Sequence, residues 1–229
     1  MRRLALFSLI IILFISCKKS TEPEYQGDSI KDIDGNVYKI LNIGTQVWMA
    51  ENLKVTHYRN GVEIQNVTDS VNWKNLTTGA YCNYDNNINN IAIYGRLYNW
   101  YAVNDTNNLA PEGWHIPSDE EWQTLREYLG GSSVAGGKLK ESGNEHWSNP
   151  NTGATNESGF TALPAGLRYF TGDYIELGYS SNFWSSSKYE YGDNEFYIVY
   201  WRLEYNNSED WRMGYYWPQS GFSVRCIKD

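Results

Sequence analysis

The sequence predicts an α+β protein with few helices, several short antiparallel strands and much irregular chain. Three observations support this class. An Asp34-Gly35 turn separates two alternating segments, a capping box at Ser118 opens an amphipathic helix, and short aromatic-rich segments bounded by turn residues fill the C-terminal half. Because no proline-rich or low-complexity linker interrupts residues 29–229, we expect a single domain there.

The first 28 residues have the layout of an export signal followed by a tether. Arg2-Arg3 precede about a dozen apolar residues, fewer than the roughly 20 that span a membrane. Residues 14–17 (FISC) are similar to the lipobox of bacterial lipoproteins. We therefore expect residues 1–16 to be removed as a signal peptide and Cys17 to carry lipid at the head of a tether, residues 17–28. An uncleaved N-terminal anchor is the alternative.

The lipidated cysteine predicts a location in the cell envelope. Lys18 rather than Asp follows Cys17, which favours the outer membrane. The lipid would be the contact with the membrane. The formal charge is −8, and a net acidic chain repels phosphate backbones, so nucleic acid is not an expected partner.

The N-terminal elements follow from turn and capping signals. Residues 30–40 read as a hairpin around Asp34-Gly35, and residues 43–53 as a turn and a second strand. Apolar residues at helical spacing predict a helix over 94–103. Ser118 and Glu121 form a capping box, after which Trp122, Leu125 and Leu129 make one apolar stripe that Gly130-Gly131 end.

The remaining elements are short strands between long loops. We expect them at residues 160–168, 183–187, 196–205 and 222–227. Cys82 and Cys226 remain beside Cys17 in an oxidising compartment, which predicts a Cys82–Cys226 disulfide; two separate buried thiols are the alternative.

A set of strings, in this order along the chain, resembles the Fibrobacter succinogenes major paralogous domain. They are residues 34–38 (DGNVY), 46–53 (QVWMAENL), 94–100 (YGRLYNW), 113–122 (GWHIPSDEEW), 183–187 (FWSSS) and 221–226 (GFSVRC). That family is similar to the C-type-lectin-like superfamily and shares features with formylglycine-generating enzymes. The resemblance implies a C-type-lectin-like fold over residues 29–229 of an exported protein. It implies no established activity.

The sequence offers little that indicates catalysis or metal binding. A formylglycine-generating enzyme needs reactive cysteines in its substrate groove, and Cys226 lies in the expected closing strand. The 3 histidines are scattered, no Cys-x-x-Cys is present, and we predict no metal and no cofactor. His115 fits a structural hydrogen-bonding role. Trp217-Pro218-Gln219 lacks the acid of the calcium-dependent lectin signatures, so their sugar site does not carry over.

Aromatic residues before the closing strand give the best candidate for a binding surface. The chain has 10 Trp and 19 Tyr, which suit either a loop-rich core or a face that stacks on sugar rings. We select Trp211, Tyr215, Tyr216 and Trp217, and expect Trp211 and Trp217 to be partly exposed. The predicted function is a non-catalytic, lipid-anchored binding module for carbohydrate or protein ligands. An exported enzyme with an unrecognised site is the alternative.

Overall fold

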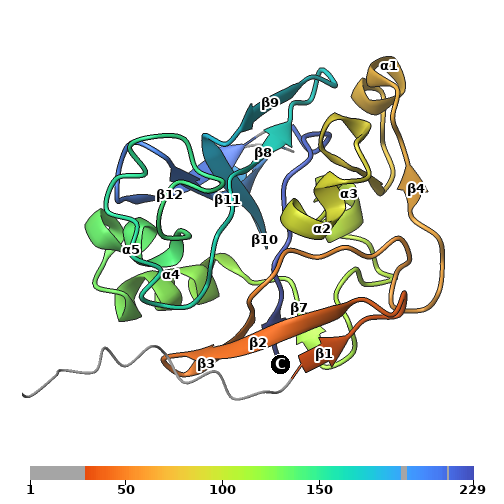
Figure 1. Cartoon of the computed structure of the whole chain (residues 1–229). Coiled ribbons are helices and arrows are strands. Elements are labelled where there is room, and N and C mark those ends of the chain that lie inside the picture. Colours follow the sequence, from red (N-terminus) through yellow and green to blue (C-terminus); the bar gives the residue numbers. More distant parts are fainter. Residues whose placement is uncertain (1–28, 192–194, 216) are drawn as a thin grey trace, which may run out of the picture.

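The computed structural model describes residues 29–191, 195–215 and 217–229, and this part of the chain confirms the α+β class. Its strands form two five-stranded sheets and one three-stranded sheet, accompanied by five α-helices (Figure 1). The predictions for residues 1–28, including the signal peptide and the lipid on Cys17, lie outside the described residues. None of the described helices is long and apolar enough to cross a membrane.

The first sheet contains the predicted N-terminal hairpin. Its strands, in spatial order, are β1 (Ser29–Lys31), β2 (Val37–Ile43), β3 (Gln46–Met49), β13 (Ile227–Lys228) and β7 (Trp114–His115). Asp32 holds the turn between β1 and β2, because its carboxylate accepts hydrogen bonds from the Asn36 backbone amide at 2.9 Å and from the Tyr38 hydroxyl at 2.5 Å. Gly35 supplies the left-handed conformation, with φ +86°. The hairpin and the second strand are confirmed.

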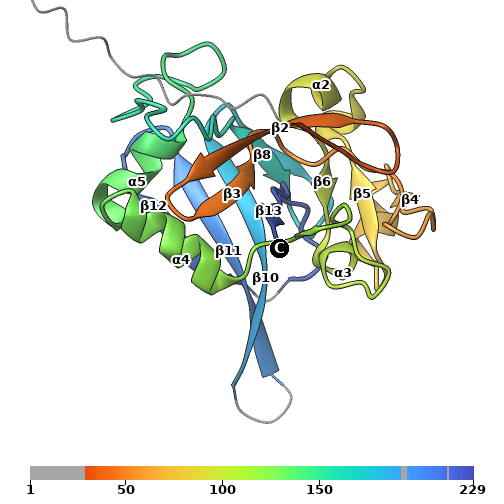
Figure 2. The same cartoon turned by 90° about the horizontal axis from the view of Figure 1, so that it is seen from below.

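The second sheet is built from the C-terminal half of the chain. Its strands, in spatial order, are β12 (Asp210–Tyr215), β11 (Glu195–Glu204), β10 (Ser180–Tyr191), β8 (Ala165–Arg168) and β9 (Tyr174–Leu177). The far ends of β10 and β11 protrude from the body of the molecule (Figure 2). The strands predicted at residues 183–187 and 196–205 are therefore confirmed as parts of β10 and β11, and the segment 160–168 becomes a strand only at β8.

Two helices cover one face of this sheet, and the sequence signals for the first are confirmed. In α4 (Asp119–Tyr128) the Ser118 side chain accepts from the Glu121 amide and the Glu121 carboxylate accepts from the Ser118 amide. α5 (Ser132–Leu139) follows directly. The apolar stripe of α4 carries Trp122 into a buried aromatic cluster, whose other rings are Trp48, Phe160, Phe183 and Trp201.

The third sheet contains β4 (Gln65–Asn66), β5 (Ala80–Cys82) and β6 (Leu97–Tyr98). The short helices α1 (Ser70–Lys74), α2 (Asn90–Tyr94) and α3 (Trp100–Val103) flank it, with a 3-10 turn at Tyr84–Asn86. The single helix predicted over 94–103 is wrong. Gly95 ends α2 with φ +73°, where an added Cβ would lie 2.8 Å from the Asn52 Cβ, and Leu97 pairs with Cys82 instead.

The closing segment is less regular than predicted. Only Ile227–Lys228 form a strand, between β3 and β7. Phe222 and Ser223 make isolated bridges to Tyr98 and Phe183, so this segment crosses from one sheet to another rather than extending one. The strand predicted over 222–227 is thus wrong for most of its length, because its partners belong to different sheets.

The predicted Cys82–Cys226 disulfide is also wrong, since both thiols are free and buried. Cys82 lies on β5 in a cluster with Trp73 and Leu97, whereas Cys226 lies in a separate cluster with Tyr38. Burial raises the pKa of the Cys82 thiol to about 11, against the opposing charge of Arg168. The alternative of two separate buried thiols is the one that the fold adopts.

Candidate functional site

The selected tryptophans lie at the surface. Trp211 retains 41% and Trp217 retains 45% of its accessible surface, as the sequence led us to expect. Tyr215 belongs to β12, and Tyr216 lies outside the described residues. Trp201, in the same aromatic stretch, is buried against α4.

Trp217 is held in a defined orientation by a second aromatic ring. Its indole stacks on Phe170, with ring centroids 4.2 Å apart and 13° between the planes. A turn fixes its backbone, because the Ser220 amide donates to the Trp217 carbonyl at 3.0 Å. The next residue is anchored as well, since the Trp100 amide donates to the Pro218 carbonyl at 2.9 Å. We call the pair Phe170–Trp217 the aromatic stack.

Phe170 occupies the tip of the hairpin between β8 and β9. The hairpin closes through hydrogen bonds from the Tyr169 amide to the Asp173 carbonyl and from the Gly172 amide to the Tyr169 carbonyl, at 2.8 and 2.9 Å. Gly172 has φ +100°, and a Cβ at this position would lie 2.6 Å from the Ser70 side chain. Glycine is therefore required both by the turn and by the close approach of the hairpin tip to α1.

An open hollow of about 500 Å³ lies along β4 and α1, the helix that the hairpin tip approaches at Ser70. Its lining is dominated by exposed amide side chains, those of Gln65, Asn66, Asn72 and Asn75, with Asp69 among them. Amides both donate and accept hydrogen bonds, so they can pair with ligand hydroxyl groups in either sense. We call this the amide hollow.

Arg168 joins the aromatic stack to the amide hollow. Its fully buried guanidinium donates to the Gly172 carbonyl at the hairpin tip and to the Val67 and Thr68 carbonyls beside the hollow, at 3.0, 2.6 and 2.9 Å. The guanidinium also lies 4.3 Å from the Trp73 ring centroid on α1. A second link is provided by Gln219, whose side-chain amide donates to the Leu76 carbonyl at 3.4 Å. Arg168 and Gln219 thus connect the hairpin and the segment after Trp217 to residues that line the hollow.

Trp211 is not a member of the stack. It lies on the edge strand β12, directly opposite Arg202 on β11. Arg202 is bound by two carboxylates, those of Glu176 at 2.7 Å and Glu204 at 2.8 Å. Burial alone would raise the pKa of Glu176, but hydrogen bonds from Arg202 and Ser180 and the charge of Arg202 lower it. The surroundings of Trp211 are therefore an ion-paired patch rather than an amide-lined one.

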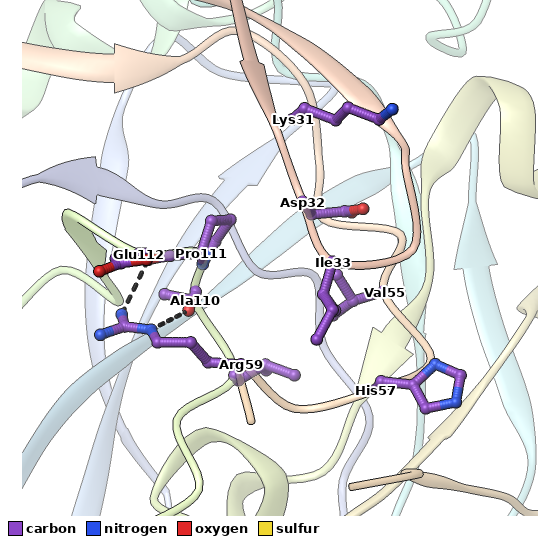
Figure 3. Close-up of a pocket in the computed structure, with 10 residues that line it drawn as sticks. Lys31, Asp32, Ile33, Val55, His57, Arg59, Ala110, Pro111 and Glu112 are labelled. Atoms are coloured by element: carbon purple, nitrogen blue, oxygen red, sulfur yellow. Dashed lines mark hydrogen bonds between the residues drawn. The ribbon is translucent and has the colours of Figure 1, made fainter. Parts of the chain in front are cut away.

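A separate crevice of about 270 Å³ lies between the β1–β2 turn and residues 109–112. Figure 3 shows Ile33, Val55 and His57 on one side of it and Arg59 with Glu112 on the other. Most of its polar side chains already form hydrogen bonds within the protein. Arg59 donates to the carbonyls of Ala110, Pro111 and Trp114, at 2.9, 2.8 and 2.6 Å.

His57 is the one side chain in this crevice that resembles catalytic machinery. Its Nδ1 lies 2.5 Å from an oxygen of Asp34, which fixes the ring as a carboxylate fixes a general base. The hydroxyl nearest to the ring, that of Thr56, lies 3.1 Å from the same nitrogen and donates to Asp34 at 3.0 Å. Within the described residues no hydroxyl or thiol is hydrogen-bonded to the other ring nitrogen.

His115 is hydrogen-bonded, as predicted, although its side chain is 40% exposed. Its Nδ1 lies 2.7 Å from Asp229 and its Nε2 lies 2.8 Å from Glu121 of the capping box. Burial lowers the pKa of the imidazole, but the two carboxylates outweigh that effect, so the pKa lies above its ordinary value of 6.5. A carboxylate on each nitrogen favours the imidazolium form.

This geometry predicts a pH-dependent contribution to stability. Because the folded-state pKa of His115 is raised, its stabilisation is fully present below pH 6.5 and is lost as the pH rises through the folded-state pKa. His115→Gln should therefore destabilise the protein more in acid than in alkaline solution. Urea unfolding of both proteins across this range measures the difference, and a difference independent of pH would contradict the assignment.

Among the described residues, one group of side chains could hold a metal ion. Glu141, Glu145 and His146 each offer a ligand atom within 4.8 Å of the others. The Nδ1 of His146 is already hydrogen-bonded to Glu141, at 2.9 and 3.0 Å to its two oxygens. No metal was predicted from the sequence, in which these three residues form no recognised ligand motif.

An α+β protein with an exposed aromatic stack beside an amide-lined hollow is the class that the fold and the site define. The chain matches the family model of the Fibrobacter succinogenes major domain over residues 41–228, and it belongs to this family. No curated protein and no solved structure shows significant similarity to the chain.

The sequence predicted the exposure of Trp217 but not its neighbours, which are Phe170 and the amides of the hollow. Phe170 lies in a short YFTGD segment, residues 169–173, whose Gly-Asp pair is typical of a turn and could have indicated this hairpin. The amides of the hollow come from two separate elements, β4 and α1. Residues that come together from separate elements have no regular spacing along the chain, so a single sequence does not reveal such a cluster.

Proposed function

We propose that the protein is a non-catalytic, lipid-anchored binding module of the cell envelope, whose ligand is a carbohydrate bound at the aromatic stack and the amide hollow. The observation that carries this proposal is an exposed indole held flat against Phe170 beside a hollow lined by exposed amides. Sugar rings present apolar faces that stack on such an indole and hydroxyl groups that pair with amides.

The rigidity of the surface supports binding. The stack, the Ser220 turn and the Arg168 bridge fix the contact groups before a ligand arrives. A preorganised surface loses little conformational entropy on binding, so more of the contact energy becomes affinity. An open hollow of about 500 Å³ also leaves room for an extended chain rather than enclosing a single small molecule.

A C-type-lectin-like fold belongs to the same proposal. The α+β class, the terminal strand β13 inserted between β3 and β7, and long loops that present the aromatic stack are compatible with it. The sugar site would nevertheless differ from the calcium-dependent one, since stacking and amides replace the acid-bearing signatures absent from this sequence.

Trp217→Ala is expected to weaken carbohydrate binding by about 1–3 kcal/mol, the range of a stacking anchor. The indole is half exposed, so its removal should change the melting temperature little. A glycan array with the mature protein identifies the ligand, and titration calorimetry then compares the variants. Trp211→Ala is the matched control and should bind normally; equal losses in both variants would place the ligand elsewhere.

Cys17→Ala is expected to release the protein from the membrane fraction. A covalently attached lipid is the strong membrane contact that the sequence predicts. Fractionation of cells, with labelled fatty acid to detect lipid on the parent protein, measures both properties. Retention of the variant in the membrane together with an unlabelled parent would contradict the lipid anchor.

A further inference from the structure

A third cavity, of about 310 Å³, lies on a different set of elements from the proposed carbohydrate surface. It is enclosed by the segment after β3, by α2, and by residues of the loop that precedes β8, and Arg225 contributes to its lining. Ala50, Ala92, Ile93 and Leu163 give it an apolar wall. We call it the Arg225 cavity.

Arg225 is a buried cation that forms no ion pair among the described residues, although the charge of the Glu51 carboxylate acts on it. Only 1% of its surface is exposed, and no carboxylate of the described chain lies within ion-pair distance of it. Its Nε and Nη2 donate to the Asn52 side-chain oxygen at 3.2 and 2.9 Å, and Nη1 donates to the Phe160 carbonyl. Both acceptors are neutral. Buried charges are normally paired, so this one is unusual.

The guanidinium has more N–H groups than the protein acceptors that it contacts. Arginine has five N–H groups, and the described contacts use one on each nitrogen, which leaves one N–H on Nη1 and one on Nη2. The Phe160 ring, 4.1 Å from the guanidinium carbon, holds its plane. A planar cation with a donor on each terminal nitrogen suits the two oxygens of a carboxylate.

The remaining charges of the cavity favour a ligand with a single negative charge. Glu51 is paired with Lys54 at 3.0 Å, and His146 with Glu141 at 2.9 Å. Two carboxylates near the cavity would repel a doubly charged anion such as phosphate. Burial lowers the pKa of Arg225 to about 9, partly opposed by the charge of Glu51, and leaves the guanidinium protonated at neutral pH.

Backbone strain marks the same cavity. Thr161, one of its lining residues, has φ +53°, a left-handed conformation that is rare for a β-branched residue. Asn156 maintains it, because its side-chain oxygen accepts from the Thr161 amide at 2.8 Å and its nitrogen donates to the Thr161 hydroxyl at 2.9 Å. Strained residues persist where the surrounding structure holds them, often at ligand sites.

We propose that the Arg225 cavity binds a small carboxylate-bearing molecule, with Arg225 as the anion contact and the alanine and leucine wall against the rest of the ligand. Two kinds of small molecule carry such a carboxylate, an acidic sugar and an amino-acid derivative. The proposal does not depend on carbohydrate binding at the aromatic stack.

Titration calorimetry with the full mature protein tests the proposal. The probes are galacturonate and N-acetylalanine, each compared with its neutral counterpart, galactose and N-acetylalaninamide. At least one acid should bind, and its counterpart should bind at least about tenfold more weakly because it lacks the charge-assisted hydrogen bonds. The acid that binds identifies the source of the ligand.

Two variants locate the site. Arg225→Lys should abolish the preference for the acid, but it also disturbs the Asn52 and Phe160 contacts. Ala92→Trp, at an exposed position on α2, should block the cavity without touching a polar contact, and Val134→Trp on α5 is its matched control. The proposal is overturned if neither acid binds, if acid and neutral probes bind equally, if phosphate binds more tightly than both acids, or if Ala92→Trp binds like the parent.

Discussion

Arg168→Met is expected to lower the free energy of unfolding by about 4 kcal/mol or more. The substitution would leave three carbonyl oxygens without their donor, those of Val67 and Gly172 in buried contacts and that of Thr68 in a partly buried one, and each buried one costs roughly 1–3 kcal/mol. The contact with Trp73 would be lost as well. Urea unfolding followed by tryptophan fluorescence gives the value.

The same variant should also separate the two halves of the proposed carbohydrate surface. Arg168 joins the hairpin tip to the edge of the amide hollow, so binding should weaken even under conditions where the variant remains folded. Arg168→Lys is the control, since it keeps the charge but cannot reach three carbonyls at once. A loss of stability below about 1 kcal/mol in Arg168→Met would show that water replaces the guanidinium and that the bridge is not structural.

Trp122→Ala is expected to destabilise the protein by about 3–5 kcal/mol, the range for deleting a buried aromatic ring. The side chain is 2% exposed and lies against Trp48 at 4.8 Å, Phe183 at 5.5 Å and Trp201 at 5.9 Å, measured between ring centroids. Its removal would leave a cavity that the rigid neighbouring rings cannot fill. Thermal and urea unfolding measure the loss.

Trp122→Phe separates packing from hydrogen bonding. The indole nitrogen of Trp122 is buried without a hydrogen-bond partner among the described residues, so phenylalanine loses volume but no hydrogen bond. This variant should therefore cost less than about 2 kcal/mol. Equal losses for the Ala and Phe variants would show that the indole nitrogen, rather than ring packing, determines the stability of this cluster.

Local signals predicted the elements that local interactions stabilise. The capping box at Ser118 and the stripe through Trp122 and Leu125 predicted α4, because a helix end and its buried face are encoded within a few turns. The Asp-Gly turn predicted the β1–β2 hairpin in the same way. Partial exposure of Trp217 followed from a polar segment that could not continue a buried strand.

The failures share a different cause, which is dependence on distant parts of the chain. Gly95 ends α2 because Asn52 lies against it, a contact between residues far apart in sequence. The pairing of Cys82 with Cys226 was inferred from the oxidising compartment and from the number of cysteines. Neither of these determines whether the two thiols lie close together in the fold. Phe170 and the amides of the hollow are brought together by Arg168, and a single sequence does not show which carbonyls a buried arginine reaches.

Carbohydrate binding on the aromatic stack is tested most directly by the NMR resonance of the Trp217 indole N–H. The resonance is assigned by its absence from the spectrum of Trp217→Ala, and Trp211→Ala assigns the internal reference. On titration with a glycan selected by the array, we expect the Trp217 resonance to shift in a saturable manner and the Trp211 resonance to stay unchanged. A saturating glycan that leaves the Trp217 resonance unchanged would contradict it.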